Sequence, residues 1–141
     1  MDKREFLEIW YRRVWEEEDL SAISEMFQPD TLARGLVDGA HVGPEEFEAF
    51  AGAMLQLVGN AKICIERFIE QGDWLAAVVS IKAEDRNTAK PVAITGQTFA
   101  KVIDGVLVES YNHLDSIGFY EQLGLMPENS FEICLMGETI G

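Results

Sequence analysis

The amino-terminal part of the chain shows the apolar spacing of amphipathic helices. Between Lys3 and about Glu18, large apolar side chains recur every three or four residues, which places them along one side of a helix. These residues are Phe6, Leu7, Trp10, Tyr11 and Val14. A second, shorter helix is predicted after Asp19, whose side chain can cap it. It should stop near Gln28, because Pro29 disfavours a helical conformation in the residue before it.

One more helix is expected before the chain changes character. Segment 31–42 contains two glycines and mixed polarity, which predicts short irregular strands or a loop. A helix should then begin at Gly43-Pro44, because proline suits the first helical position and two glutamates follow at the positive end of the helix dipole. Its apolar side carries Phe47, Phe50, Met54 and Val58, and Gly59 should end it.

The alternation and turn signals after residue 60 predict an antiparallel meander. Strands over 61–71 and 74–83 are joined by a Gly-Asp dipeptide, and strands over 92–103 and 106–115 by an Asp-Gly dipeptide. Both dipeptides are typical of two-residue hairpin turns. The polar segment 84–91 connects the two hairpins. A candidate fifth strand, FEICLM, lies in the tail and can pair with a sheet edge or a neighbouring subunit.

The last hairpin also gives a register, provided that neither strand contains a bulge. Counting outward from its turn, Thr98 faces Tyr111 and Gly96 faces His113. A glycine opposite the histidine leaves space above the sheet, which suits a cavity. The alternative is that Gly96 marks a bulge, which would shift the pairing beyond it by one residue.

The second predicted strand, WLAAVVSIKA, is apolar on both faces, whereas a sheet with one wet face would alternate. The helices can cover only one of these faces. We therefore expect the outer face of the sheet to contact a second subunit in a homodimer. The alternative is that the small residues Ala76 and Ala77 are tolerated in the open.

Length and charge limit the domain organisation and the partners. With 141 residues the chain is expected to be one domain, over residues 1–141. Its 25 acidic and 11 basic residues give a net charge of -14, which argues against nucleic-acid and membrane partners. No apolar run reaches the roughly 20 residues that span a bilayer, and the start MDKREFLEIW lacks the apolar core of a secretion signal. A cytoplasmic protein is expected.

The candidate chemistry lies where the last strand meets a short helix, in GVLVESYNHLDSIGFYEQLG. In a regular strand Tyr111, His113 and Asp115 project to the same side. We expect Asp115 to act as a base with a pKa raised by burial, and Tyr111 and His113 to donate a hydrogen bond or orient the acid. The predicted pocket lining is Trp10, Phe27, Phe47, Phe50, Met54 and Phe68, with Gly96 leaving room beside it.

Each of these side chains also has a structural interpretation. Asp115 can simply cap the helix that follows it. His113 can be a half-buried strand residue, and the aromatic and methionine side chains can be ordinary core. Cys64 and Cys134 stand in apolar contexts without metal-ligand spacing, so both are expected to be buried small hydrophobes.

Three stretches resemble the SnoaL-like polyketide cyclases of the nuclear transport factor 2-like superfamily. They are Gly43-Pro44-Glu45-Glu46, the run AITGQTFAKVIDGVLVES, and the ending YNHLDSIGFYEQLG. The resemblance covers about residues 6–124 and leaves the tail 125–141 outside it. It implies a cone-shaped α+β fold, with amino-terminal helices packed on a curved antiparallel sheet. It also implies that Asp115 acts as general acid/base in an intramolecular aldol closure without metal or cofactor.

The family often carries a histidine in the irregular segment, where Arg34 and His41 are the candidates here. Relatives with this fold isomerise steroids or hydrolyse epoxides, so an isomerase or lyase reaction would also fit. The leading interpretation is a cofactor-independent enzyme acting on a small, apolar carbonyl compound. The alternatives are a non-catalytic protein that binds small hydrophobic ligands, and a dimerising accessory domain.

Overall fold

The computed structural model describes residues 2–35 and 42–140 and shows a mixed α+β fold. The predicted first helix is present as α1 (Lys3–Tyr11), which continues as a π-helix, η1 (Arg12–Glu16). The amide of Glu17 donates to the carbonyl of Arg12 at 2.8 Å, and this spacing of five residues is that of a π-helical turn. The wider turn begins directly after Tyr11, and such turns are often found at functional sites.

The other helices are α2 (Ser21–Met26), α3 (Pro44–Leu57), α4 (Ser116–Gln122) and α5 (Ser130–Leu135). Three of them, α2, α3 and α4, begin close to the predicted places, whereas α5 was not predicted. The Asp19 carboxylate accepts a hydrogen bond from the Ser21 amide at 3.2 Å and so supports the start of α2. Across the described parts of the chain, no helix has the length and apolarity to cross a membrane.

Five strands form one sheet in the order β1-β5-β4-β3-β2. They are β1 (Phe27–Arg34), β2 (Val58–Gln71), β3 (Trp74–Asp85), β4 (Pro91–Ile103) and β5 (Val106–Leu114). The four strands of the predicted meander are confirmed and pair antiparallel. β1 pairs parallel with β5 at the edge of the sheet, where Pro29 is tolerated because an edge strand has one side without partners.

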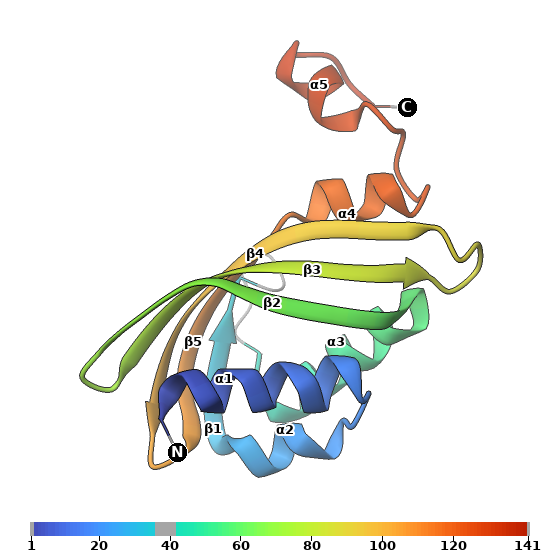
Figure 1. Ribbon diagram of the computed structural model, residues 1–141. Helices are drawn as coiled ribbons and strands as arrows, with labels where there is room; N and C mark the ends of the chain where they lie inside the picture. The colour runs from blue at the N-terminus through green and yellow to red at the C-terminus, as the bar shows by residue number, and fades with distance from the viewer. Residues whose placement is uncertain (1, 36–41, 141) are drawn as a thin grey trace.

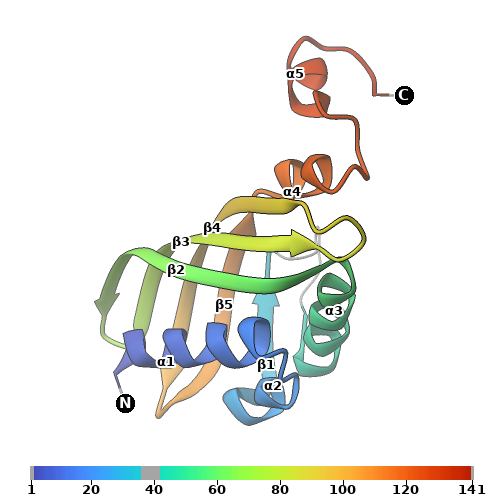
Figure 2. The same ribbon diagram turned by 45° about the vertical axis from the view of Figure 1, so that its right-hand side comes forward.

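The helices α1, α2 and α3 lie together on the concave face of the curved sheet (Figure 1). The turned view shows the same arrangement, with the sheet wrapping over the helices (Figure 2). Helix residues Phe6, Trp10, Ile23 and Phe47 are buried against strand residues such as Leu75, Val79, Ala100 and Leu107. The core therefore lies between the helical layer and the inner face of the sheet.

The predicted register of the last hairpin is wrong, because a bulge lies close to its turn. The first pairs, Ile103 with Val106 and Val102 with Leu107, leave Val108 without a partner before pairing resumes. One extra residue moves every later side chain of β5 to the opposite face. The bulge lies on β5 at Val108 and not at Gly96, where the sequence alternative placed it.

The bulge decides which β5 side chains face the helices. Gly96 pairs with Leu114 and Thr98 with Asn112. The expected space above Gly96 is filled, since a Cβ built there would lie 2.8 Å from Cδ2 of Leu114. Ser110, Asn112 and Leu114 lie on the inner face, whereas the residues between them lie on the outer face.

The outer face of the sheet carries large apolar side chains in the open. The pairings place Arg34, Tyr111, Phe99, Ala76 and Ile69 in one row across all five strands. Ile69 is 72% exposed and Phe99 48% exposed, and Trp74 stacks on Phe99 with ring centroids 4.7 Å apart. The sheet is thus apolar on both faces, as predicted. The homodimer through the outer face stays a prediction.

The predictions for the tail segment FEICLM and for the two cysteines are wrong. The candidate fifth strand FEICLM forms α5, since so short an apolar run satisfies a helical and a strand period equally. The fifth strand of the sheet is β1 instead. Both cysteines are exposed, because Cys64 points to the outer face of β2 and Cys134 lies on α5, which projects from the body (Figure 1).

Candidate functional site

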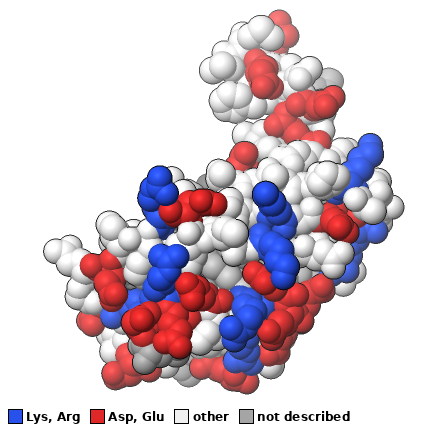
Figure 3. Space-filling view, in the orientation of Figure 1, with Lys and Arg blue, Asp and Glu red and all other residues white. Residues whose placement is uncertain are grey.

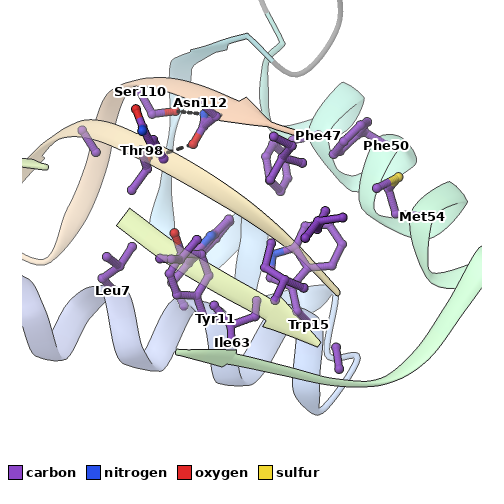
Figure 4. A pocket seen from close by; sticks show the side chains of 18 of the residues that line it. Leu7, Tyr11, Trp15, Phe47, Phe50, Met54, Ile63, Thr98, Ser110 and Asn112 are labelled. Atoms are coloured by element: carbon purple, nitrogen blue, oxygen red, sulfur yellow. Dashed lines mark hydrogen bonds between the residues drawn. The ribbon is translucent and has the colours of Figure 1, made fainter. Parts of the chain in front are cut away.

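A cavity of about 120 Å³ lies between the helices and the inner face of the sheet. Its helical side is built by Trp10 and Tyr11 of α1, Trp15 of η1, and residues of α3. Figure 4 shows Phe47, Phe50 and Met54 projecting from α3 toward the same space as Tyr11 and Trp15. Most of the strand residues that line it are aliphatic, so the cavity is predominantly apolar.

Stacked aromatic rings fix one end of the cavity. Trp10 stacks on Phe27 with centroids 5.1 Å apart, and Phe47 lies 5.2 Å from Phe27 and 5.4 Å from Trp10. All three rings are buried. Because close-packed rings of this kind resist displacement, they form a rigid wall of the site.

A hydrogen-bonded polar group interrupts the apolar lining on the sheet side. The Thr98 hydroxyl donates to Oδ1 of Asn112 at 2.9 Å, and Nδ2 of Asn112 donates to the Ser110 hydroxyl at 3.1 Å. Thr98 and Ser110 are buried. The three residues, here called the amide cluster, come together through the β4–β5 pairing and are joined by the dashed lines in Figure 4.

Tyr11 places a phenol in the apolar part of the cavity. Burial raises the pKa of Tyr11 well above its ordinary value, because desolvation disfavours the phenolate. The hydroxyl has no hydrogen-bond partner among residues 2–35 and 42–140, and it is not fully buried. Tyr11 reaches from α1 into the space, and the amide cluster lies on the strands (Figure 4). Because its pKa is raised, the Tyr11 hydroxyl remains protonated and can donate a hydrogen bond to a ligand.

The three predicted catalytic residues do not lie in this cavity. Asp115 is exposed and caps α4, accepting a hydrogen bond from the Gly118 amide at 3.0 Å. The structural interpretation of Asp115 is thus confirmed. The expectation that it projects into a pocket beside Tyr111 and His113 is wrong, because the strand ends at Leu114 and the bulge at Val108 turns the other two outward.

Tyr111 and His113 do share a face, but it is the outer one. The Tyr111 hydroxyl donates to Oε2 of Glu109 at 2.6 Å, and this hydrogen bond raises its pKa. The Arg34 guanidinium lies 5.7 Å from the Tyr111 ring centroid, so Arg34 also belongs to the outer face. His113 is exposed. The other histidine candidate, His41, lies outside the described residues.

The predicted apolar lining agrees better with the structure than the predicted catalytic residues do. The structure puts five of the expected side chains around the cavity: Trp10, Phe27, Phe47, Phe50 and Met54. Phe68 instead packs against the edge of the core beneath the Arg4 guanidinium, and Gly96 is covered by Leu114. Sequence reasoning missed Tyr11, Trp15 and the amide cluster. A phenol inside the apolar stripe of the first helix was the available signal for Tyr11.

In the described part of the chain, no group of three His, Cys, Asp or Glu side chains is arranged to hold a metal ion. The described cavity lining contains no Asp, Glu or His. Its polar groups include the protonated phenol of Tyr11, the amide cluster and the indole N–H groups of two tryptophans, in an apolar surrounding. Such a site can orient an uncharged polar ligand by hydrogen bonds and would exclude a charged one, which would lose its hydration.

A curved sheet over three helices, with a cavity between them, defines the class of the nuclear transport factor 2-like α+β folds. The sequence profile of the SnoaL-like polyketide cyclases matches residues 7–123, and the chain belongs to this family. The family predicted from the sequence motifs is therefore confirmed. A search of curated protein sequences found no significant match.

Several solved structures share this fold. IdmH from Streptomyces antibioticus, named as a candidate polyketide cyclase, superposes with a TM-score of 0.75 at 18% identity, covering 88% of this chain and 99% of its own. A candidate polyketide cyclase from Bacillus cereus gives 0.75 at 22% identity, with 85% and 78% covered. AclR from Streptomyces galilaeus, named as a candidate hydroxylase, gives 0.73 at 16% identity, with 89% and 100% covered. Similarity at these identities shows the shared fold.

Proposed function

We propose that the protein binds a small, flat, mostly apolar carbonyl compound in the cavity between helices and sheet. One observation carries this proposal: the protonated hydroxyl of Tyr11 stands without a partner inside an apolar space. The hydroxyl is half-buried and borders the cavity, so it is free to donate a hydrogen bond to a ligand oxygen there. The aromatic wall of Trp10, Phe27 and Phe47 suits a flat ligand.

The cavity volume limits the size of the ligand. At about 120 Å³ it is smaller than a cavity of about 150 Å³ that holds benzene. A six-membered ring with a carbonyl group is larger than benzene, so it enters only with a small movement of the lining side chains. A fused polycyclic ligand would require side chains such as Trp15 or Phe50 to move, since both lie on the helical side of the lining.

The binding test uses two probes that differ only in the polar group. Acetophenone has a ring and a carbonyl oxygen, whereas ethylbenzene has a similar shape without the oxygen. We expect acetophenone to raise the melting temperature more than ethylbenzene, because a ligand that binds only the folded state stabilises it. Equal shifts for the two compounds, or none, would contradict the proposal.

A matched pair of variants locates the polar contact. Thr98 faces the cavity, whereas Thr95 on the same strand is exposed. Thr98→Val should weaken acetophenone binding, because it removes the hydroxyl that orders Asn112. Thr95→Val should leave binding unchanged. The affinity measured by calorimetry for both variants decides whether the amide cluster participates.

Membership in the cyclase family supports a second candidate function, intramolecular aldol closure. In that reaction the Tyr11 hydroxyl would stabilise the enolate oxygen, which is the role of a preorganised donor. The described lining supplies no carboxylate or imidazole as base, which favours binding as the first candidate. Incubation with a linear aromatic polyketone, followed by chromatography, tests closure. Enzyme-dependent cyclic product that falls in Tyr11→Phe would establish catalysis, and its absence together with acetophenone binding would establish binding alone.

A further inference from the structure

We propose that residues 125–140, here called the arm, bind to the outer sheet face of a second copy of this protein. The arm lies beyond the region that matches the family, which ends at residue 123. It contains α5 and projects from the body in both ribbon views (Figures 1 and 2). The inference concerns assembly and does not depend on the ligand of the inner cavity.

The arm exposes more large apolar surface than its length explains. Its exposed side chains include Leu125, Phe131, Leu135 and Met136, with Leu135 74% and Met136 69% exposed. Phe131 and Leu135 are four residues apart, so they lie on the same side of α5. Clustered apolar side chains of this kind mark an interaction surface when nothing in the same chain covers them.

The arm is held away from its own sheet by specific contacts. The Ser130 amide donates to Oε2 of Glu121 at 3.0 Å, and the Ser130 hydroxyl donates to the carbonyl of Pro127 at 2.6 Å. Ser130 is buried at this junction. The Gln122 side chain in turn hydrogen-bonds both backbone groups of Ala93 on β4. These bonds fix the base of the arm to α4, which is itself held on β4, and the apolar side chains of the arm are exposed.

The outer sheet face offers a complementary hollow of about 420 Å³. It is larger than a cavity of about 150 Å³ that holds one benzene ring, so it can take the rings and branched chains of the arm together. Its floor includes Ile69, Val78, Phe99 and Tyr111, of which the first three are exposed apolar side chains. The hollow therefore needs an apolar occupant, and the arm carries the matching side chains.

Charge favours the same pairing. The arm contains Glu128, Glu132 and Glu138, and the chain has no Lys or Arg after Lys101. In Figure 3 the projecting carboxyl-terminal part carries red and white atoms but no blue ones. Arg67 lines the hollow and makes no ion pair within the described parts of the chain, and the one carboxylate bonded to a lining residue, Glu109, is occupied by the Tyr111 hydroxyl. In a chain of net charge -14 this patch is suited to an acidic partner segment.

A reciprocal exchange satisfies both surfaces at once. If each of two copies places its arm on the other's sheet, the contact repeats under two-fold symmetry and closes as a dimer. Face-to-face contact of the sheets alone would leave both arms uncovered. The predicted homodimer through the outer face would then contain the arms as part of the interface.

The two exposed cysteines allow a direct test with the unmodified chain. Cys64 points outward from β2, three residues from Arg67, and Cys134 lies on α5 of the arm. Equal amounts of nitrogen-14 and nitrogen-15 labelled protein would be mixed, treated with a bismaleimide spanning about 10 Å, roughly three strand residues, and analysed by mass spectrometry. We expect Cys64–Cys134 links that join a light and a heavy chain, and their loss in Cys64→Ser and in Cys134→Ser.

Several results would overturn the inference. Links between Cys64 and Cys64 would indicate that the sheets meet without the arms, and light-light or heavy-heavy Cys64–Cys134 links alone would place the arm on its own sheet. A monomer at all concentrations in analytical ultracentrifugation would also refute it. Leu135→Asp should reduce the dimer at least tenfold in association constant. Thr139→Asp, which adds the same charge to an exposed arm position, should leave it within about threefold.

The basic side of the contact is tested by charge reversal. Arg67→Glu should weaken the dimer, whereas Lys90→Glu, at an exposed position away from the hollow, should leave it unchanged. Circular dichroism on each variant separates loss of assembly from loss of folding. Equal weakening by Arg67→Glu and Lys90→Glu would mean that overall charge, and not this hollow, governs association.

Discussion

Replacement of Tyr11 by phenylalanine should stabilise the free protein and weaken ligand binding. The hydroxyl lies in an apolar space without a partner among the described residues, and its pKa is raised by desolvation. A fully buried unsatisfied polar group costs about 1–3 kcal/mol, and the Tyr11 hydroxyl is not fully buried. Because the Tyr11 side chain is only half-buried, water still reaches part of it, and the expected gain is at the lower end, about 1 kcal/mol. For a chain of this size that corresponds to a rise in melting temperature of about 3–5 °C.

The same substitution removes the donor to the ligand oxygen. Loss of one neutral hydrogen bond of about 1 kcal/mol lowers affinity roughly fivefold. Urea unfolding without ligand and calorimetry with acetophenone measure the two effects on one protein sample. Tyr111→Phe is the control, because its hydroxyl is already bonded to Glu109 on the outer face, so it should show neither the stabilisation nor the loss of affinity.

Two results would refute this reasoning. If Tyr11→Phe destabilises the free protein, the hydroxyl has an acceptor and is not available to a ligand. If it stabilises the protein but leaves acetophenone affinity unchanged, the ligand oxygen is held elsewhere. Ethylbenzene binding should be insensitive to the substitution, which separates a polar contact from a change in the shape of the cavity.

Three further predictions follow from particular contacts. The pKa of Tyr11 in the folded protein lies above its ordinary value of 10.0, so the contribution of Tyr11 protonation to stability is complete below pH 10 and is lost as the pH rises further. Tyr11→Phe should therefore reduce the loss of stability at alkaline pH in denaturation curves. Parallel pH dependences for the two proteins would contradict this prediction. Asp115→Ala should lower stability by about 1 kcal/mol and Asp115→Asn by less, since the side-chain oxygen caps α4, while neither changes acetophenone affinity. Gly96→Ala should lower stability by about 1 kcal/mol or more, because its Cβ would lie 2.8 Å from Cδ2 of Leu114 and 3.2 Å from the His113 carbonyl oxygen; unchanged urea midpoints would show that Leu114 moves aside freely.

Local sequence patterns were sufficient for most of the secondary structure. The apolar spacing from Phe6 to Val14 marks a helix in any context, and Gly43-Pro44 marks the start of α3 because proline fits the first helical turn. The Gly-Asp and Asp-Gly turns placed all four antiparallel strands. These signals depend on residues close in sequence, which is why they can be read without the fold.

The site could be predicted less well from the sequence, because it depends on one extra residue in β5 that shifts the strand register. The bulge at Val108 leaves no clear mark in VLVESYNHL, yet it directs Asn112 and Ser110 inward and Tyr111 and His113 outward. The register of β5 is set by its hydrogen bonds to β4 and by the packing of Leu114 over Gly96, and both involve residues far apart in the chain. The unpaired hydroxyl of Tyr11 also depends on the tertiary structure, because the surrounding helices and strands bring no hydrogen-bond partner to it within the described parts of the chain.

The sequence by itself therefore determined the family, the helices, the meander and the aromatic character of the interior. The tertiary structure alone decided which face of β5 lines the cavity, that Asp115 caps a helix at the surface, and that the arm stands clear of the sheet. The physical reason is the range of the interactions: spacing and turn preferences act between neighbours, whereas burial, register and cavity shape are set by contacts between distant parts of the chain.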